Sequence, residues 1–209
     1  MRILHISDLH FDDKKQYLDD IKEKLVELLT NEKIDYFIFS GDLISSPNKI
    51  NDFVLAKEKF INPILKQLNL TDESFFICEG NHDAKRNEEL PIISETFSKF
   101  KNNSEIENFI KINNGQQLEA SLKNHQLYYD FIKNNINFPT NDIIIPLYSI
   151  HERLYNNKII NIVTINSAWR STSTDNDQSN LFYPISILEE IVEKTGKDAF
   201  KILIMHHPL

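Results

Sequence analysis

Apolar positions along the chain fall into two patterns, short continuous runs and helical stripes. Short apolar runs bounded by polar residues are typical of buried strands. They lie at residues 2–7, 34–40, 74–79 and 201–205, and two further runs within 145–168 are joined at Asn156-Asn157. Apolar residues spaced three or four apart are typical of helices that pack on one face, and they lie at 16–30, 51–68 and 184–195. Pro63 lies inside the second stripe and is expected to kink or split that helix.

The order of these elements predicts the topology of the first part of the chain. Strand, helix, strand, helix and strand follow one another as far as residue 79, which indicates parallel strands joined by right-handed crossovers. We therefore expect an α/β fold. In open α/β sheets, functional sites form outside the carboxyl ends of the strands, so the residues that follow each strand are the first candidates for chemistry.

Residues 84–158 interrupt this alternation. The part from 84 to 145 is rich in Asn, Lys, Glu and Ser, with short helical patterns near 90–112 and 117–135. We expect a helical insertion that forms a cap over the site, within one domain that covers 1–209. His125 and His151 lie in this insertion and are expected to be exposed. The polar stretch 171–180 is expected to be a loop.

Composition and charge limit the possible functions. The chain has 209 residues, of which 41% are hydrophobic and 26% charged, as in folded globular domains. Its net charge of −8 argues against non-specific binding to duplex DNA, which needs a basic surface. That charge does not exclude a nucleotide or another phosphate substrate, because bound metal ions can supply positive charge locally.

The cellular location of the protein is predicted from its cysteine content and from the search for membrane spans and a signal peptide. Cys78 is the only cysteine, so no intrachain disulfide can form. No apolar run approaches the roughly 20 residues of a membrane span, and the first residues do not resemble a signal peptide. We expect a cytoplasmic protein that does not cross a membrane.

Side chains that bind metals follow the predicted strands one after another. They are Asp8 and His10, then Asp42, then Asn81, His82 and Asp83, and finally His206 and His207. A mixture of carboxylate, imidazole and amide ligands suits Mn, Fe or Zn. Asp8 and His10 are two residues apart, so in an extended chain their side chains point the same way. Gly41 permits a sharp turn before Asp42, whose carboxylate is placed to bridge two cations.

This set of potential metal ligands predicts a displacement reaction at the phosphorus atom of a phosphate ester. Two divalent metal ions about 3.5–4 Å apart clamp a phosphate for in-line displacement, in which a metal-bound hydroxide attacks and both ions stabilise the developing charge. His82 is then free to act as a general acid that protonates the leaving oxygen. Asp83 is expected to orient the His82 imidazole and to raise its pKa.

The segments "DLH", "GDL", "GNHD" and "HHP", each after a predicted strand, together resemble the calcineurin-like metallophosphoesterases from residue 8 to residue 208. The resemblance implies a four-layer α/β/β/α sandwich with a dinuclear metal site at the strand ends. It implies that Asp8 and His10 bind the first metal, that Asp42 bridges both, that Asn81 and His206 bind the second, and that His82 is the catalytic residue. We expect His207 to contact either the substrate or the metal ligands.

The chain departs from the family pattern in two places. Glu79 stands where proline often precedes Gly-Asn-His, and no Gly-His-x-His motif is present. Because that motif usually supplies one ligand to each metal, we expect the chain to be part of a longer protein. The missing ligands, and any further domains, would then lie beyond Leu209.

Three interpretations of function follow. The first is a metal-dependent phosphohydrolase that acts on phosphodiesters. Its candidate substrates are cyclic nucleotides, other small diesters, nucleic-acid ends and phosphoproteins. The acidic net charge of the chain favours a small molecule or nucleotide among them. The second is a non-catalytic binding or regulatory module, favoured by the missing motif and opposed by the intact Asn81 and His82. The third, an N-terminal phosphoesterase domain of a larger protein, accounts for both observations.

Overall fold

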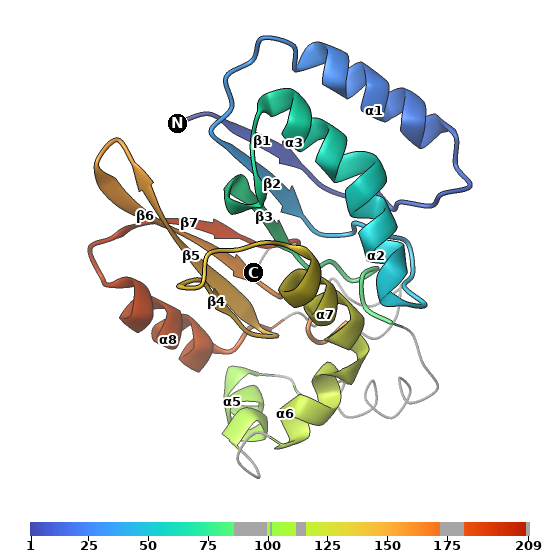
Figure 1. Ribbon diagram of the computed structural model, residues 1–209. Coiled ribbons are helices and arrows are strands. Elements are labelled where there is room, and N and C mark those ends of the chain that lie inside the picture. Colours follow the sequence, from blue (N-terminus) through green and yellow to red (C-terminus); the bar gives the residue numbers. More distant parts are fainter. Residues whose placement is uncertain (86–99, 101, 112–115, 172–181, 208–209) are drawn as a thin grey trace.

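Two β-sheets lie face to face between helices in the computed structural model, which describes residues 1–85, 100, 102–111, 116–171 and 182–207 (Figure 1). The first sheet contains three parallel strands in the order β1 (Ile3–Ile6), β2 (Tyr36–Ser40) and β3 (Phe75–Cys78). Every residue of β2 and β3 is buried. This burial explains why both strands are continuous apolar runs, as expected for parallel strands covered on both faces.

Four helices pack on the outer face of the first sheet: α1 (Tyr17–Leu28), α2 (Ile50–Ala56), α3 (Asn62–Leu68) and α7 (Gln126–Asn135). A π-helical turn, Lys57–Ile61, joins α2 to α3 immediately before Pro63. Proline has no N–H to donate to the i→i−4 ladder, and a π-turn is itself a local departure from that ladder. The expected interruption near Pro63 is therefore confirmed as a turn inside an otherwise continuous helical segment.

The second sheet contains β4 (Ile143–Ile144), β5 (Tyr148–Tyr155), β6 (Lys158–Ile165) and β7 (Phe200–Ile204), in that order. Strands β4, β5 and β6 are antiparallel, whereas β7 runs parallel to β6. Asn156 and Asn157 have φ angles of 49° and 61° and form the β5–β6 turn, as in hairpins with two left-handed residues. Helices α8 (Ile185–Thr195) and α5 (Asn103–Lys111) contribute apolar side chains to the outer core of this sheet.

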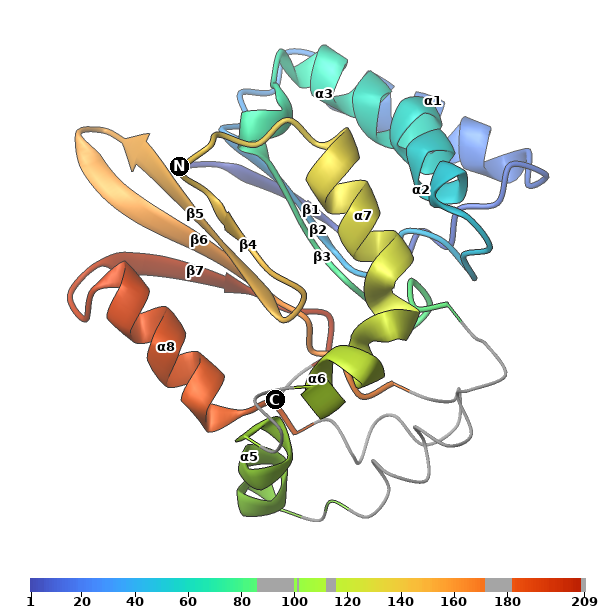
Figure 2. The ribbon, with the colours of Figure 1, turned by 60° about the horizontal axis from the view of Figure 1, so that its bottom comes forward.

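An apolar core lies between the two sheets. Tyr36, Ile38, Phe76 and Cys78 of the first sheet pack with Ile160, Ile162 and Ile204 of the second. Figure 2 shows the resulting order of layers, with helices outside both sheets. The predicted four-layer α/β/β/α sandwich is confirmed, and Cys78 is buried as a free cysteine. Among the described residues, no helix has the length and apolar character needed to cross a membrane.

The expected insertion at 84–158 differs from the prediction. Its last part forms β4 and then β5 with the turn that follows it, as the strand pattern within 145–168 predicts, whereas α7 packs into the core with α2. Only α6 (Gln116–Ser121), the 3₁₀ turn Leu122–His125 and α5 remain as shorter helices, while 86–99 lies outside the described residues. Most of the expected loop at 171–180 also lies outside them.

The expected exposure of His125 and His151 is wrong. Their exposed fractions are 2% and 1%. Each imidazole is buried against a carboxylate, Glu79 for His125 and Asp142 for His151, at distances of 2.7 and 2.6 Å. A buried polar group is tolerated when it is hydrogen-bonded, and these partners provide the bonds.

Candidate metal centre

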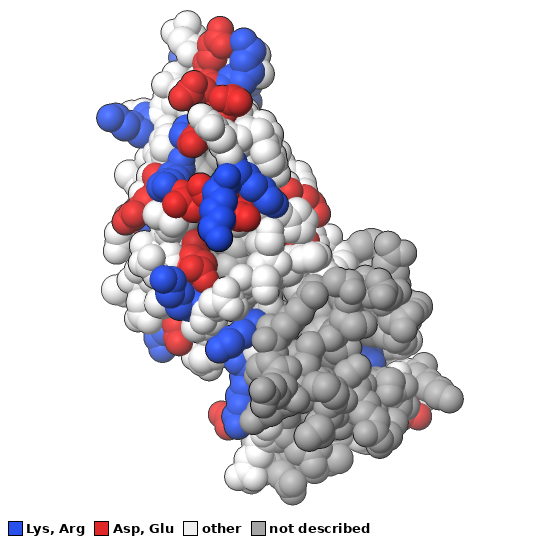
Figure 3. Space-filling model, turned by 90° about the vertical axis from the view of Figure 1, so that its right-hand side faces the viewer, with Lys and Arg blue, Asp and Glu red and all other residues white. Residues whose placement is uncertain are grey.

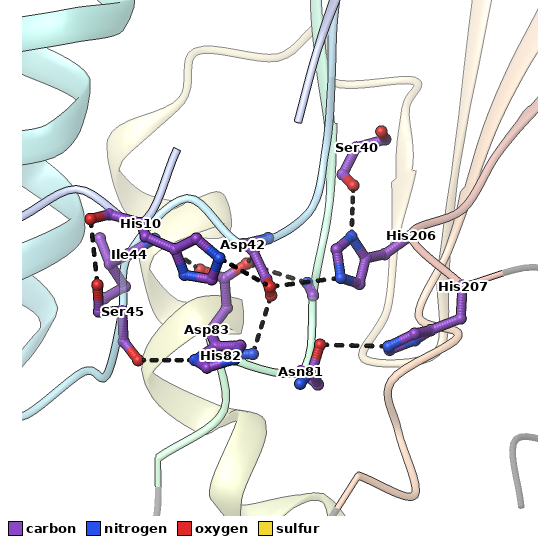
Figure 4. Close-up of polar contacts among 11 residues, drawn as sticks. His10, Ser40, Asp42, Ile44, Ser45, Asn81, His82, Asp83, His206 and His207 are labelled. Atoms are coloured by element: carbon purple, nitrogen blue, oxygen red, sulfur yellow. Dashed lines mark hydrogen bonds and ion pairs between the residues drawn. The ribbon is translucent and has the colours of Figure 1, made fainter. Parts of the chain in front are cut away.

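The candidate site lies where β1, β2, β3 and β7 end (Figure 4). Asp8 and His10 follow β1 in a left-handed conformation, with φ angles of 57° and 47°. The expected extended geometry is therefore wrong for these two residues. Instead, Asp8 N–H donates to the Gly41 carbonyl at 3.1 Å and His10 N–H donates to the Asp42 carbonyl at 3.0 Å. These bonds continue the β1–β2 pairing into the loops and bring the two segments together.

Two glycines allow the loops to approach each other closely. A Cβ atom at Gly41, whose φ is +90°, would lie 2.5 Å from Nδ1 of His206. A Cβ atom at Gly80 would lie 2.1 Å from Oδ1 of Asp42. Because real Cβ contacts are longer than these distances, both positions need a residue without a side chain. The glycines of "GDL" and "GNHD" thus fit the site sterically.

The Asp42 carboxylate lies at the centre of the cluster. Its Oδ2 is 3.6 Å from Nε2 of His10 and 3.4 Å from Nε2 of His206, while its Oδ1 accepts a 2.9 Å hydrogen bond from His82 N–H. Burial acts to raise the pKa of Asp42, but its contacts with His206 and His82 outweigh burial and lower that pKa. Asp42 is therefore a carboxylate that faces two imidazoles from different sheets.

His206 is held from both sides of its ring. Nδ1 donates to the Ser40 carbonyl at 2.8 Å, which leaves Nε2 directed at Asp42. Burial acts to lower the pKa of His206, but the Asp42 and Ser40 contacts outweigh burial and raise it to about 9. A carbonyl that fixes one ring nitrogen while the other faces a cation site is common among metal-binding histidines.

His207 lies beside Asn81. Its Nε2 is 3.2 Å from Asn81 Oδ1, and its N–H donates to Ser167 Oγ at 2.9 Å. Burial, followed by the neighbouring His206, lowers the pKa of His207 to about 4. The ring is thus neutral and placed next to the amide that was expected to bind the second metal.

Asp83 does not orient the His82 ring, contrary to expectation. Its side chain is fully buried, and its carboxylate accepts hydrogen bonds of 2.9–3.0 Å from the backbone N–H groups of Asp42, Ile44 and Gly80. Burial raises the pKa of Asp83 to about 7, although the bonds from Ile44 and Gly80 act to lower it. Asp83 therefore fixes the loop that carries Asp42.

Ser45 contacts the His82 imidazole instead. His82 Nδ1 donates to the Ser45 carbonyl at 3.1 Å, and Ser45 Oγ donates to the His10 carbonyl at 3.1 Å. The His10 and His82 rings meet edge to face, with centroids 4.6 Å apart. A backbone carbonyl can come from any residue type, so the sequence contained no signal for this role.

Two groups of side chains offer ligand atoms to a cation. The potential ligand atoms of Asp8, Asp42 and His206 lie within 4.8 Å of one another, and so do those of His10, Asp42 and His82. Asp42 is common to both groups. The carboxylate and imidazole donors fit a divalent cation. The grouping differs from the expectation, because Asp8 lies with His206 rather than with His10, and the His82 ring lies with His10.

A cleft of about 970 Å³ opens beside these residues. Asp8, His10 and His82 lie on its wall, together with Ser45 from the loop after β2. Apolar side chains of α1, including Leu18, form another wall, and Lys15 and Lys24 also line the cleft. The candidate site is therefore open to a ligand considerably larger than phosphate.

The chain is similar to known proteins at two levels, a family model and individual relatives. The chain matches the family model of calcineurin-like phosphoesterases over residues 1–209. It is 24% identical to the uncharacterised metallophosphoesterase-like protein YydB of Bacillus subtilis, over the whole chain and 43% of that relative. It is 36% identical to the DNA double-strand break repair protein Mre11 of Saccharolobus solfataricus, over 41% of the chain and 23% of that relative. The chain thus spans less than half the length of these relatives.

Proposed function

This chain belongs to the calcineurin-like phosphoesterase family, and we propose that it is a metal-dependent phosphodiesterase. The family supports a phosphoester substrate and divalent metals. The observation that carries the proposal for this chain is the Asp42 carboxylate between Nε2 of His10 and Nε2 of His206. A carboxylate between two imidazoles from separate loops is suited to bridging two cations.

The proposed ligands divide between two ions. Asp8 and His10 would hold the first, Asn81 and His206 would hold the second, and Asp42 would be shared. Their oxygen and nitrogen donors suit Mn, Fe or Zn. Bound ions of this kind supply Lewis acidity and generate a nucleophile from water at neutral pH.

His82 is the proposed general acid. The Ser45 carbonyl holds the proton on Nδ1, so Nε2 is the atom that transfers a proton to the leaving oxygen. Only the backbone N–H of His82 bonds to Asp42, whereas His10 and His206 direct ring nitrogens at it. This difference supports a role for His82 other than metal binding, although a ring nitrogen of His82 also lies within 4.8 Å of the potential ligand atoms of His10 and Asp42.

The proposed substrate is a small phosphodiester, and a nucleotide fits this class. The cleft beside the site can take an organic group next to the phosphate, and its apolar wall and two lysines suit a moderately hydrophobic anion. The net charge of −8 favours a small substrate over duplex DNA. The DNA repair function in the name of the archaeal relative belongs to that protein.

The second candidate function is a non-catalytic binding module. The absence of Gly-His-x-His favours it, because two ligands usual in the family are missing from this sequence. The two functions differ in one measurement, the hydrolysis of bis-p-nitrophenyl phosphate with Mn²⁺ present. Turnover above the metal-only rate supports the phosphodiesterase, although we expect it to be slow; metal binding without turnover supports the module.

The proposal is tested first by calorimetric titration with Mn²⁺. We expect the wild-type chain to bind Mn²⁺ and Asp42→Asn to lose that binding, because the shared ligand loses its charge. Asp142→Asn is the matched control: this carboxylate is also buried and bonded to a histidine, but it pairs with His151 and Arg153. It should reduce thermal stability and leave Mn²⁺ binding intact. Equal binding by wild type and Asp42→Asn would contradict the proposed site.

A further inference from the structure

A buried carboxylate lies directly behind the candidate site. Glu79 follows β3 and precedes Gly80, and only 2% of it is exposed. Its Oε1 accepts a hydrogen bond from His125 Nδ1 at 2.7 Å, and its Oε2 accepts one from Asn166 Nδ2 at 2.7 Å. His125 and Asn166 are 2% and 5% exposed. The three side chains therefore form a hydrogen-bonded group that is shielded from solvent.

This group joins three parts of the fold. Glu79 belongs to the end of the first sheet, His125 to the turn that begins α7, and Asn166 to the segment after β6 of the second sheet. His125 also has a hydrogen bond to the backbone of Trp169. Burial acts to lower the pKa of His125, but the contact with Glu79 outweighs burial and raises it. Burial also raises the pKa of Glu79, although the contact with His125 acts to lower it. The two side chains are held 2.7 Å apart in the core.

Further bonds continue from this group to the metal-site loops. Asn81 and His82 are two and three residues after Glu79 in the same tight loop. On the other side, Ser167 follows Asn166, and its Oγ accepts the N–H of His207. The backbone N–H of Lys85 donates to the Asn124 carbonyl at 2.7 Å, next to His125. Both loops that carry proposed ligands of the second metal are therefore connected to the same buried pair.

We propose that Glu79 and His125 are positioning residues, which hold the Asn81 loop of the first sheet in register with His206 and His207 of the second. The inference rests on the proposed metal site. Asn81 is a neutral ligand and cannot be drawn to a cation as strongly as a carboxylate, so its contribution depends on where the backbone places it. Groups that orient metal ligands commonly change metal affinity by about 10–100-fold when they are removed.

A second buried pair in the same chain provides a matched control. His151 Nδ1 and Asp142 Oδ2 are 2.6 Å apart, and their side chains are 1% and 0% exposed. The described contacts of His151 are with Ser149, Asp142 and the rings of Phe76 and Phe138, none of which is a proposed ligand. Breaking this pair should have the general cost of disrupting a buried carboxylate–imidazole contact, without an effect on the metal loops.

The experiment compares His125→Gln with His151→Gln by Mn²⁺ calorimetry and thermal unfolding. Both variants should melt at lower temperature than wild type. We expect His125→Gln to bind Mn²⁺ about 10–100-fold more weakly, and His151→Gln to bind it as tightly as wild type. If His125→Gln does not fold, the double variant Glu79→Leu/His125→Leu is titrated instead. It leaves no unpaired buried charge, and Asn166 Nδ2 keeps the Pro146 carbonyl as an acceptor.

The outcomes separate this inference from the proposed function. A wild-type chain that binds no Mn²⁺ overturns both. The positioning role alone is overturned if the wild type binds Mn²⁺ and His125→Gln binds it with the same affinity. The same holds for the double variant if it replaces His125→Gln in the experiment. An equal loss of affinity in His151→Gln also overturns it, because the effect would then follow from general destabilisation.

Discussion

His82 and His206 each donate Nδ1–H to a main-chain carbonyl, but their surroundings differ. His206 Nε2 is directed at Asp42, and the pKa of His206 is raised to about 9, whereas His82 donates its backbone N–H to Asp42. The same type of hydrogen bond thus directs Nε2 of His206 at a carboxylate, whereas it leaves the His82 ring beside the cleft. This difference separates the proposed ligand from the proposed acid.

Replacing His82 tests that separation. In whichever form of the protein shows phosphodiesterase turnover, His82→Ala should reduce turnover by about 10²–10⁴-fold, as expected for loss of a general acid. Mn²⁺ affinity should stay the same, because the proposed ligands are intact. Turnover is measured with bis-p-nitrophenyl phosphate and affinity by calorimetry. Loss of Mn²⁺ would instead make His82 a ligand, in agreement with its place beside His10 and Asp42.

Gly41 and Gly196, the two glycines with positive φ among the described residues, offer a second test at this scale. Gly41→Ala places a methyl group against the His206 ring, whereas a Cβ at Gly196 meets no atom within 4 Å. Both variants carry the strain of an L residue at positive φ, about 1–3 kcal/mol. Only Gly41→Ala should also weaken Mn²⁺ binding, by roughly tenfold or more, because His206 must move. Unaltered affinity in Gly41→Ala would mean that His206 is not a ligand.

Among the elements, α7 has a different role from the cap predicted for its part of the chain. Phe131 of α7 is fully buried and stacks on Phe53 of α2, with ring centroids 5.3 Å apart. Phe131→Ala should therefore reduce the free energy of unfolding by about 3–5 kcal/mol. Asn134→Ala changes an exposed residue of the same helix and should have little effect. Urea denaturation measures both, and similar small effects would mean that α7 is a detachable cap.

The strands and their polar ends could be predicted from the sequence because each depends on a local pattern. An apolar run followed by Asp42 or His206 identifies both the strand and the candidate ligand. The burial of His125 could not be predicted in this way, because it depends on Glu79, 46 residues away in the chain. The left-handed backbone at Asp8 and His10 likewise follows from pairing with the loop after β2, which a run of polar residues does not reveal.

Across the whole molecule, charge and site shape point to the same class of ligand. The chain carries 31 acidic and 23 basic residues. On the face shown in Figure 3, Lys and Arg side chains are interspersed with Asp and Glu. Proteins that track duplex DNA instead gather basic side chains along a stripe. The cleft beside His82 can take a small organic phosphate without such a stripe.

Binding to DNA therefore provides the test at the scale of the molecule. Because the chain has a net charge of −8, we expect it to neutralise few DNA phosphates, so little counterion release favours association. We expect no gel shift of random-sequence duplex DNA at protein concentrations up to roughly 10 µM, in about 150 mM NaCl, with or without Mn²⁺. Even basic proteins bind DNA non-specifically with dissociation constants of only about 10⁻⁴–10⁻⁶ M. A single-stranded oligonucleotide of the same length serves as the comparison for nucleic-acid ends. Tight, salt-dependent binding to the duplex would contradict the preference for a small phosphodiester and make a nucleic acid the better candidate substrate.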